Sequence, residues 1–294
     1  MSLDAVTSEI LAMGPFAREQ APYGLVRVDG ADAIDYLQRL CSQDIDGLEP
    51  GQLAPAAFLD AKGKVVVTCL AFRHDQTIWL ELQAHQQPTL LELLDRYHFS
   101  ERVTFAAANA GRCHEVVQAA GGKAGWRGEI AGDAVVVQCD RRGVNFVRRH
   151  GATVDAGAAQ PLSDDLAECL RMAAGFVRVG VDTEPSTLAL EADLDDHCST
   201  TKGCYTGQEV VARIHTYGHT NRRLCFLQLN GGPPITAPAT LLEPDEGVAV
   251  GRVMHAVQVP GRELRYGLGY LPPDFQAPGS RLIVAENGEA VVVW

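Results

Sequence analysis

The chain has 294 residues, enough for two domains whose cores need neither disulfides nor metal ions. Hydrophobic residues make up 46% of it and charged residues 21%, which is typical of globular proteins and excludes a disordered chain. With 25 Lys and Arg against 37 Asp and Glu, the net charge of -12 excludes general attraction to nucleic acid, so an anionic ligand needs a local basic pocket.

The first hundred residues predict an α+β unit. Alternating and β-branched runs indicate strands, and apolar residues spaced by three and four, such as Leu37 and Leu40, indicate helices. The expected elements are a strand at 23–28, a helix at 30–41, a hairpin of 64–72 and 77–82, a helix from Pro88 and a strand at 103–105. This β-α-β-β-α-β order is typical of a ferredoxin-like unit.

The pattern recurs in part over the next residues. We expect a helix at 114–120, strands at 134–139 and 143–147, and a helix capped by Ser163 that ends at Gly175. From Leu224 onward, helical periodicity stops and short strands alternate with Gly- and Pro-rich turns. The expected strands are 225–229, 248–253, 266–270 and 291–294. They predict a C-terminal all-β barrel or sandwich.

The apolar runs and the cysteines bear on the cellular compartment. No apolar run approaches the roughly 18 residues of a membrane span, and the N-terminal residues lack the pattern of a signal or transit peptide. Eight cysteines are scattered without a CxxC pair, as in proteins kept in a reducing compartment. A cytoplasmic protein without membrane partners is therefore expected.

The most informative segment is the run Lys202-Gly203-Cys204-Tyr205-Thr206-Gly207-Gln208-Glu209. Glycine permits a positive φ and close approach of a ligand. An ammonium group near a thiol favours the thiolate and so lowers the pKa of the cysteine. Cys204 is therefore the candidate reactive thiol, with Lys202 as its electrostatic partner. On composition alone, the opposite interpretation, a loop cysteine beside a solvated lysine, is the more common one.

The same run resembles the signature of the YgfZ family, the folate-binding relatives of the glycine-cleavage aminomethyltransferase, or T-protein. The resemblance includes KGCYTGQEVVAR followed by residues 221–224, and it extends to 28–30, 35–40, 60–65 and 95–97. It covers most of the chain, and it is weak between residues 110 and 160. It implies two interlocked ferredoxin-like subdomains and a C-terminal β-barrel around a central folate site. The expected regions are 1–223, with a subdomain boundary near 110 unless the two interleave, and 224–294.

The resemblance also implies a function. Members of this family bind tetrahydrofolate or a one-carbon derivative and support the assembly or repair of iron–sulfur clusters in client proteins. Their effect on tRNA modification is indirect, so no direct nucleic-acid partner is expected. The residues carried over to the site are the catalytic candidates Cys204 and Lys202 and the ligand-binding candidates Gly203, Tyr205, Gly207, Gln208, Glu209, Arg213, Glu191 and Asp195. The two acids are carried over as acceptors for pterin N–H groups.

Two departures from the family pattern count against aminomethyl transfer. Ala173 stands where the related RxEAG pattern has a glutamate that contacts the pterin, and residues 105–109 lack the aspartate of the aminomethyltransferases. Loss of that carboxylate removes a charge-assisted contact of about 1.5–3 kcal/mol. Three hypotheses remain open: a folate-dependent helper, with or without turnover; a true aminomethyltransferase; and a folate-binding scaffold whose thiol is incidental.

Other motifs carry less weight. His114-Glu115 begins like a zinc-protease motif but has Gln118 in place of the second histidine, and Cys198, Cys204, His215 and His219 lack zinc-finger spacing. No metal site is therefore expected. The pair Arg222-Arg223 is interpreted as a solvated strand edge, with a grip on a folate carboxylate as the alternative. Arg141-Arg142 and Arg148-Arg149 form another small basic cluster, which without interleaved aromatic residues gives little support for a nucleic-acid surface.

Overall fold

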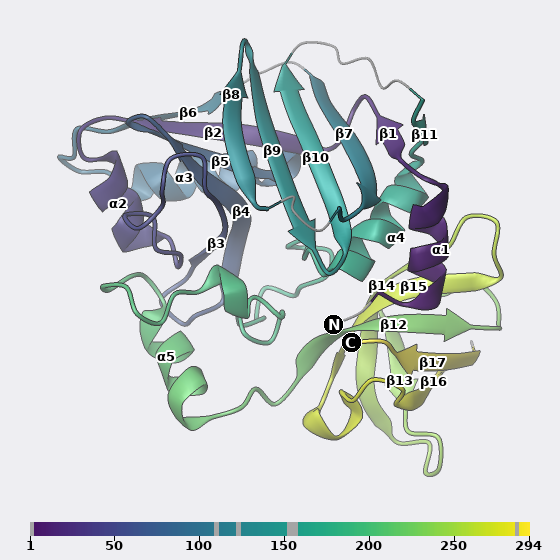
Figure 1. Cartoon of the computed structure of the whole chain (residues 1–294). Helices are drawn as coiled ribbons and strands as arrows, with labels where there is room; N and C mark the ends of the chain where they lie inside the picture. Colours follow the sequence, from purple (N-terminus) through teal and green to yellow (C-terminus); the bar gives the residue numbers. More distant parts are fainter. Residues whose placement is uncertain (1–2, 109–111, 122–124, 152–157, 286–287) are drawn as a thin grey trace.

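The computed structural model describes residues 3–108, 112–121, 125–151, 158–285 and 288–294 (Figure 1). Two sheets pack beside each other, and a separate barrel lies below the second sheet in this view. The expected boundary near residue 110 and Asn109 lie outside the described residues.

The first sheet has the strand order β3-β4-β5-β2-β6 and is antiparallel throughout. Its elements are β2 (Tyr23–Asp29), α2 (Ala33–Leu40), β3 (Leu53–Leu59), β4 (Val65–His74), β5 (Thr77–Gln83), the 3-10 turn η1 (Ala84–Gln86), α3 (Gln87–Arg96) and β6 (Thr104–Ala108). Without β3, which the periodicity did not predict, the order β4-β5-β2-β6 is that of a ferredoxin-like unit. Leu90 and Leu94 of α3 are fully buried, as their spacing predicts.

The second sheet has the order β11-β1-β7-β10-β9-β8. Its elements are α1 (Ala5–Met13), β1 (Phe16–Arg18), β7 (Arg112–Ala119), β8 (Arg127–Ala131), β9 (Ala134–Arg141), β10 (Val144–Gly151), β11 (Gln160–Pro161) and α4 (Asp164–Ala174). Ser163 caps α4 by accepting from the Leu166 N–H, and Gly175 ends it with φ 76°. Strand β1 precedes the whole first sheet in the chain yet pairs with β7, so the two sheets are interlocked.

The predicted helix at 114–120 is wrong, because this segment is strand β7, paired with β10 along its length. Both faces of β7 are covered: His114 and Glu115 are buried, although they alternate in direction. Burial on both faces removes the polar and apolar alternation that identifies a strand in a sequence.

The C-terminal strands close into a barrel of order β12-β15-β14-β13-β16-β17. They are β12 (Arg223–Asn230), β13 (Ala239–Leu242), β14 (Ala249–Gln258), β15 (Leu264–Leu271), β16 (Arg281–Val284) and β17 (Gly288–Val292), with the 3-10 turn η3 (Pro273–Phe275) before β16. Leu227, Val253 and Leu271 belong to the core inside the barrel. The predicted fold class, α+β with interlocked subdomains and a C-terminal barrel, is confirmed.

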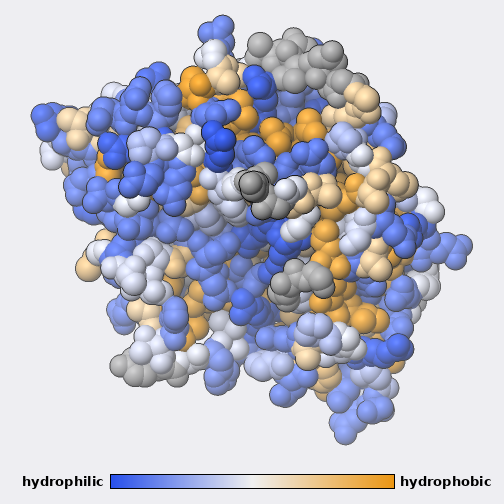
Figure 2. All heavy atoms as spheres, viewed as in Figure 1, coloured by the Kyte–Doolittle hydropathy of each residue, from blue (hydrophilic) through white to orange (hydrophobic). Residues whose placement is uncertain are grey.

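The exposed surface in Figure 2 is hydrophilic over α2 and its neighbours, and more apolar toward α1 and the barrel. Within the described ranges, no helix is long and apolar enough to cross a membrane.

Candidate functional site

The segment with the family signature forms a loop between the 3-10 turn η2 (Asp195–His197) and helix α5 (Gln208–Tyr217). Helix α5 stands out from the body in Figure 1. All eight cysteines lie in the described part of the chain; Cys204 alone is exposed, and the other seven are buried. The loop therefore presents its thiol to solvent.

Two glycines allow this loop to pack backbone to backbone against the turn at 60–63. Gly207 has φ 83°, and a Cβ there would lie 2.6 Å from the carbonyl oxygen of Asp60. Gly63 has φ 74°, and its Cβ would lie 2.8 Å from that of Val210. Side chains at either position would separate the two segments. Gly203 differs, because a Cβ there would meet open space and its φ is not in the left-handed region.

Lys202 anchors the loop. Its ammonium group donates hydrogen bonds to the carbonyl oxygens of Cys41 at 2.7 Å and Gln43 at 2.6 Å. It also lies 5.2 Å from the ring centre of Tyr205, and burial lowers its pKa. Within the described ranges, Lys202 makes no contact with Cys204 that would make it an ion-pair partner of the thiol. The arrangement makes Lys202 a positioning residue.

The remaining signature residues divide between the loop and α5. Tyr205 is buried and donates to the carbonyl oxygen of Ser199 at 3.2 Å. Gln208 begins α5 and is half-buried. Glu209 and Arg213 lie on exposed positions of α5, and their side chains have no partner among the described residues. The structure thus places these side chains on the same outer segment as Cys204.

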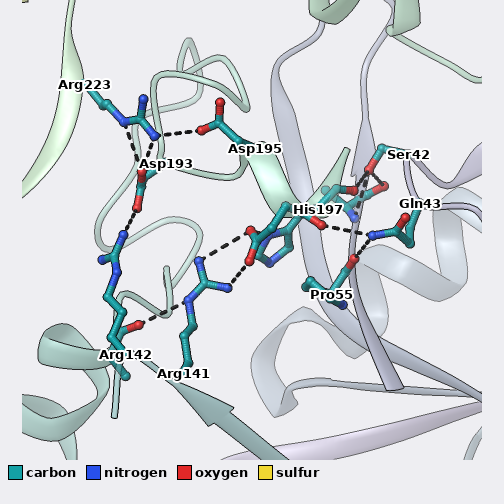
Figure 3. A network of polar contacts seen from close by, with 12 residues as sticks. Ser42, Gln43, Pro55, Arg141, Arg142, Asp193, Asp195, His197 and Arg223 are labelled. Carbon is teal, nitrogen blue, oxygen red and sulfur yellow. Dashed lines mark hydrogen bonds and ion pairs between the residues drawn. The ribbon is translucent and has the colours of Figure 1, made fainter. Parts of the chain in front are cut away.

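The acidic segment before the loop is held by arginines from two other parts of the chain (Figure 3). Asp193, in the left-handed region with φ 60°, pairs with Arg142 at 2.7 Å and with Arg223 at 2.5 Å. Asp195 pairs with Arg223 at 2.9 Å, and Asp196 pairs with Arg141 at 2.5 Å. The β9–β10 turn and β12 therefore contact this segment. The loop after α2 also contacts it, because Gln43 and Ser42 donate to the carbonyl oxygens of Asp196 and His197.

The predicted pterin acceptors are thus already engaged. The Glu191 carboxylate accepts from the Leu188 N–H and pairs with Arg222 at 3.3 Å. The interpretation of Arg222-Arg223 as a solvated strand edge is incomplete, because both partly exposed guanidinium groups are counter-ions of this segment or its neighbours. The same is true of Arg141 and Arg142. Sequence patterns do not show which acid pairs with which base over such separations.

Residue 173, where the family pattern has a glutamate, is an alanine packed in the interior. Ala173 is buried, and its carbonyl oxygen accepts from the indole N–H of Trp294 at 3.3 Å. The Trp294 ring lies between Arg142, 3.4 Å from the ring centre, and Phe226, with ring centres 5.7 Å apart. An aromatic side chain from the end of the barrel thus covers the surface beside Ala173.

Two cavities lie near the junction of the two sheets. The central cavity, of about 40 Å³, is lined by residues that include Tyr23, Cys69, Gln83 and Arg148. The larger one, which we call the α4 cavity, is about 450 Å³ and is lined from β1, β2, β10, α4 and β14. Tyr23 and Gln83 line both. The central cavity has room for one or two water molecules, whereas the α4 cavity can hold a flat organic ring.

Gln83 and Tyr23 face each other across β5 and β2. Gln83 is 8% exposed, yet its amide has no hydrogen-bond partner among the described residues. The Tyr23 hydroxyl likewise has none within the described ranges, and burial raises its pKa. Both side chains line the two cavities, so their polar atoms can bond a ligand or water there. Nothing in the sequence identified either residue.

A buried ion network forms the wall behind this pair. Arg148 of β10 pairs with Glu81 of β5 at 2.7 Å and with Glu115 of β7 at 3.4 Å, and it lies 4.1 Å from the ring centre of Tyr23. His150 bonds Glu81 at 2.6 Å. Burial raises the pKa of Glu81, but Arg148 and His150 lower it by more, so the net shift is downward. The network joins the two sheets.

A second cluster ties the barrel to α4. His255 of β14 lies 3.2 Å from Glu168 and 3.3 Å from Asp182, and Arg171 pairs with both acids. Arg178 also pairs with Glu168. Burial lowers the pKa of His255, but the two carboxylates raise it by more. Burial raises the pKa of both acids, but Arg171, His255 and neighbouring donors together lower it by more.

This cluster predicts a pH dependence for the contribution of His255 to stability. Because its pKa is raised above 6.5 on folding, its stabilisation is fully present below pH 6.5 and is lost as pH rises through the folded pKa. Asp182 and Glu168 act in the opposite sense, because their pKa values are lowered on folding. Their contribution to stability is lost as pH falls below the ordinary pKa values of 3.8 and 4.5. Urea unfolding of the parent and His255→Gln should therefore differ more at pH 5.5 than at pH 8.5. An equal difference at both values would contradict this assignment.

Exposure also predicts the pattern of thiol labelling. Burial raises the pKa of each of the seven other cysteines, for example to about 11 for Cys41 and about 12 for Cys198. Because alkylation requires an accessible thiolate, iodoacetamide should label one site per native chain. Peptide mass spectrometry should find the label on Cys204, and Cys204→Ser should remain unlabelled. Labelling of several cysteines in the native protein would contradict the burial described here.

Among the described residues, no group of three or more His, Cys, Asp and Glu side chains is arranged to hold a metal ion. No family model matches the chain. It is 30% identical over 237 residues to the tRNA-modifying protein YgfZ of Yersinia enterocolitica, covering 74% of this chain and 71% of that protein. It is 26% identical over 248 residues to a mitochondrial iron–sulfur cluster assembly factor homologue of Mycosarcoma maydis, covering 76% and 59%.

Two further similarities extend over almost the whole chain. A chloroplastic protein of Arabidopsis thaliana named as a transferase is 23% identical over 300 residues, covering 92% of this chain and 68% of that protein. The crystal structure of glycine cleavage system aminomethyltransferase T from Bartonella henselae has the same fold. It superimposes with a TM-score of 0.75 at 18% identity, over 95% of this chain and 85% of that one.

Proposed function

Because the chain belongs to the YgfZ family, we propose that it is a tetrahydrofolate-binding factor that supports the assembly or repair of iron–sulfur clusters in client proteins. Relatives named as a tRNA-modifying protein and as an iron–sulfur cluster assembly factor support this class of function. We further propose that any effect on tRNA passes through client enzymes, and that the protein acts in the cytoplasm. The absence of disulfides among its eight cysteines supports that location.

The proposal rests on one observation, the exposure of the Cys204 thiol to solvent. Seven cysteines are buried, while this one is exposed on a loop that Lys202, Tyr205 and Gly207 hold in place. In this proposal the Cys204 thiolate is the reacting group. Gly203 leaves the space beside it open, and Gln208, Glu209 and Arg213 on α5 contact the ligand or client next to it.

The α4 cavity is the folate site that the side chains fit best. Tyr23 and Phe146 offer aromatic surfaces, and the unpartnered Gln83 amide can both donate and accept. Glu115 and Glu168 also line the cavity; both are already paired with arginines, so they can accept from the N–H groups of a pterin only through their remaining lone pairs. When bound, tetrahydrofolate would supply a carrier for a one-carbon unit. Glu191 and Asp195 are secondary candidates, since a ligand reaches them by displacing Arg222 or Arg223.

Calorimetric titration with tetrahydrofolate and 5-formyltetrahydrofolate tests the folate part. We expect saturable binding by the parent, with affinity about threefold to tenfold weaker in Tyr23→Phe and in Gln83→Leu, because each loses one hydrogen bond worth about 1 kcal/mol. Tyr97→Phe is the matched control, since Tyr97 is exposed and lines neither cavity. Glu191→Ala should bind like the parent.

Each other result has a definite meaning. No binding by the parent would refute the folate part and leave a thiol-dependent factor. Binding that is lost in Glu191→Ala but unchanged in Gln83→Leu would move the ligand from the α4 cavity to the acidic segment.

Aminomethyl transfer is the second candidate, favoured by the aminomethyltransferase fold. It has less support, because residue 173 is an alanine covered by Trp294 and the described residues 105–108 carry no acid. Transfer of a methylene group from an aminomethylated lipoyl carrier protein to tetrahydrofolate would establish it.

A further inference from the structure

The two sheets end in the edge strands β3 and β6 of the first sheet and β8 and β11 of the second (Figure 1). An open strand edge presents unpaired backbone N–H and C=O groups to other chains, so proteins cover such edges or place charges and proline on them. Three of these edges are protected. The segment 41–43 pairs with β3 and the segment 51–53 with β8 through backbone hydrogen bonds, and β11 is only two residues long and ends in Pro161.

Strand β6 carries none of these protections in the described part of the chain. Its sequence, Thr104-Phe105-Ala106-Ala107-Ala108, contains no charged residue and no proline. One edge of β6 pairs with β2 over all five residues, and no backbone group within the described ranges pairs with the other edge. Thr104 and Ala106 are exposed, and the other three residues are half-buried. The edge of β6 can therefore accept another strand without burying a charge.

The loop before β6 adds an apolar side chain to this part of the surface. Residues 97–103 connect α3 to β6, and Phe99 in this loop is 82% exposed. The Glu101 carboxylate fixes the loop by accepting from the Phe99 N–H at 3.0 Å and from the next N–H at 3.1 Å. His98 packs edge-on against Phe105 of β6, with ring centres 5.7 Å apart. The loop thus holds an exposed phenylalanine next to the open edge, as interaction surfaces do.

The side chains of β6 are complementary to those of a second, antiparallel copy of the same strand. In a two-fold pair about Ala106, Phe105 of each copy lies opposite Ala107 of the other, so that each ring packs over a methyl group. On the other face of the sheet, Ala106 lies opposite its own copy and Thr104 lies opposite Ala108. No pair brings together two charges or two bulky side chains. This self-complementarity favours a second copy over an unrelated strand.

We propose that two copies of the chain associate through β6, paired antiparallel about Ala106, so that the first sheet of one copy continues into that of the other. An antiparallel pair keeps equivalent faces on the same side, so α2 and α3 of both copies lie on one face of the joined sheet. A five-residue strand pair makes a small interface, so the dimer should be weak and reversible, with a Kd of about 1–100 µM. The interface shares no residue with the Cys204 loop or the α4 cavity and is independent of the proposed function.

Sedimentation equilibrium over about 1–300 µM tests the association. The parent should change from monomer to dimer across this range. Ala106→Lys should raise the Kd of the dimer about tenfold, because it places two ammonium groups opposite each other at the symmetry axis. Position 106 is exposed, so the variant should fold like the parent. The matched control is Ala212→Lys, which makes the same change at an exposed position of α5 and should dimerise like the parent.

Disulfide cross-linking tests the register of the pair. In a Cys204→Ser background, which removes the exposed thiol, Ala106→Cys should give a covalent dimer on oxidation with copper phenanthroline, because the two copies of residue 106 face each other. Thr104→Cys is the matched control on the same face of β6. Its two copies would be about 13 Å apart, four residues of strand, whereas a disulfide requires Cα atoms within about 7 Å. Thr104→Cys should therefore stay monomeric on a denaturing gel.

Three results would overturn the proposal. A parent that stays monomeric over the whole concentration range would leave a strand of another protein as the occupant of this edge. Equal dimerisation of the parent and Ala106→Lys would place the interface elsewhere on the molecule. Equal cross-linking of Thr104→Cys and Ala106→Cys would refute the antiparallel register about Ala106.

Discussion

Replacement of Cys204 by serine is expected to reduce iron–sulfur enzyme activity in cells to the level of cells that lack the protein. Serine keeps the size of the side chain but removes a group that can form a thiolate at neutral pH. Because Cys204 is exposed, thermal stability should stay within about 0.5 kcal/mol of the parent. The measurement is the activity of iron–sulfur enzymes in a host whose own family member has been deleted, with expression levels checked by immunoblot.

Cys198→Ala is the matched control for this test. Cys198 lies six residues earlier in the chain and is buried, so its replacement removes a thiol without changing the exposed surface of the loop. We expect it to retain activity. Full activity of Cys204→Ser would refute the thiol-dependent factor and favour the folate-binding scaffold whose thiol is incidental.

The largest effect on stability is expected for Arg148→Met. The change removes the cation shared by Glu81 and Glu115, both of which are about 1% exposed. Breaking a buried ion pair from one side leaves uncompensated charge and costs about 3–5 kcal/mol. For a chain of this size, that loss corresponds to a fall in Tm of about 10 °C. Calorimetry and urea unfolding at pH 7 measure it.

Arg149→Met provides the comparison for Arg148→Met. Arg149 follows it on β10, is less buried, and has no ion pair among the described residues. The same chemical change there should alter stability by less than about 0.5 kcal/mol. If both variants unfold at the parent's midpoint, the network is not what holds the two sheets together.

Much of the fold could be predicted from local pattern. The helix around Leu90 and Leu94 has one apolar face, and the cap at Ser163 with the stop at Gly175 marks both ends of α4. Strands such as β1, only three residues long, carry too little pattern to be recognised. The prediction for β7 was wrong for a different reason. Polar residues such as His114 and Glu115 are buried on both of its faces, so its sequence lacks the alternation of polar and apolar residues that indicates a strand.

The site was predictable only in part. The glycines around Cys204 indicated an unusual backbone, and Gly207 has the positive φ that such a residue permits. The role of Lys202 depends on carbonyl groups about 160 residues away in the chain, which no local spacing shows. The same holds for Gln83, whose importance comes from the absence of a partner rather than from any motif.

The interlocked strand order also affects how the protein can be made. The first sheet uses residues 23–108 alone and can form as soon as they leave the ribosome. Strand β1 emerges earlier but must wait for β7, nearly one hundred residues later. The delay is longer for Asp4, because its carboxylate accepts a hydrogen bond from the Tyr266 hydroxyl of the barrel, 262 residues later in the chain. At about 5–20 residues per second, that delay is roughly 15–50 s. During that time the N-terminal helix and strand lack their native partners, so slower translation prolongs the exposure of their apolar residues to chaperones and proteases.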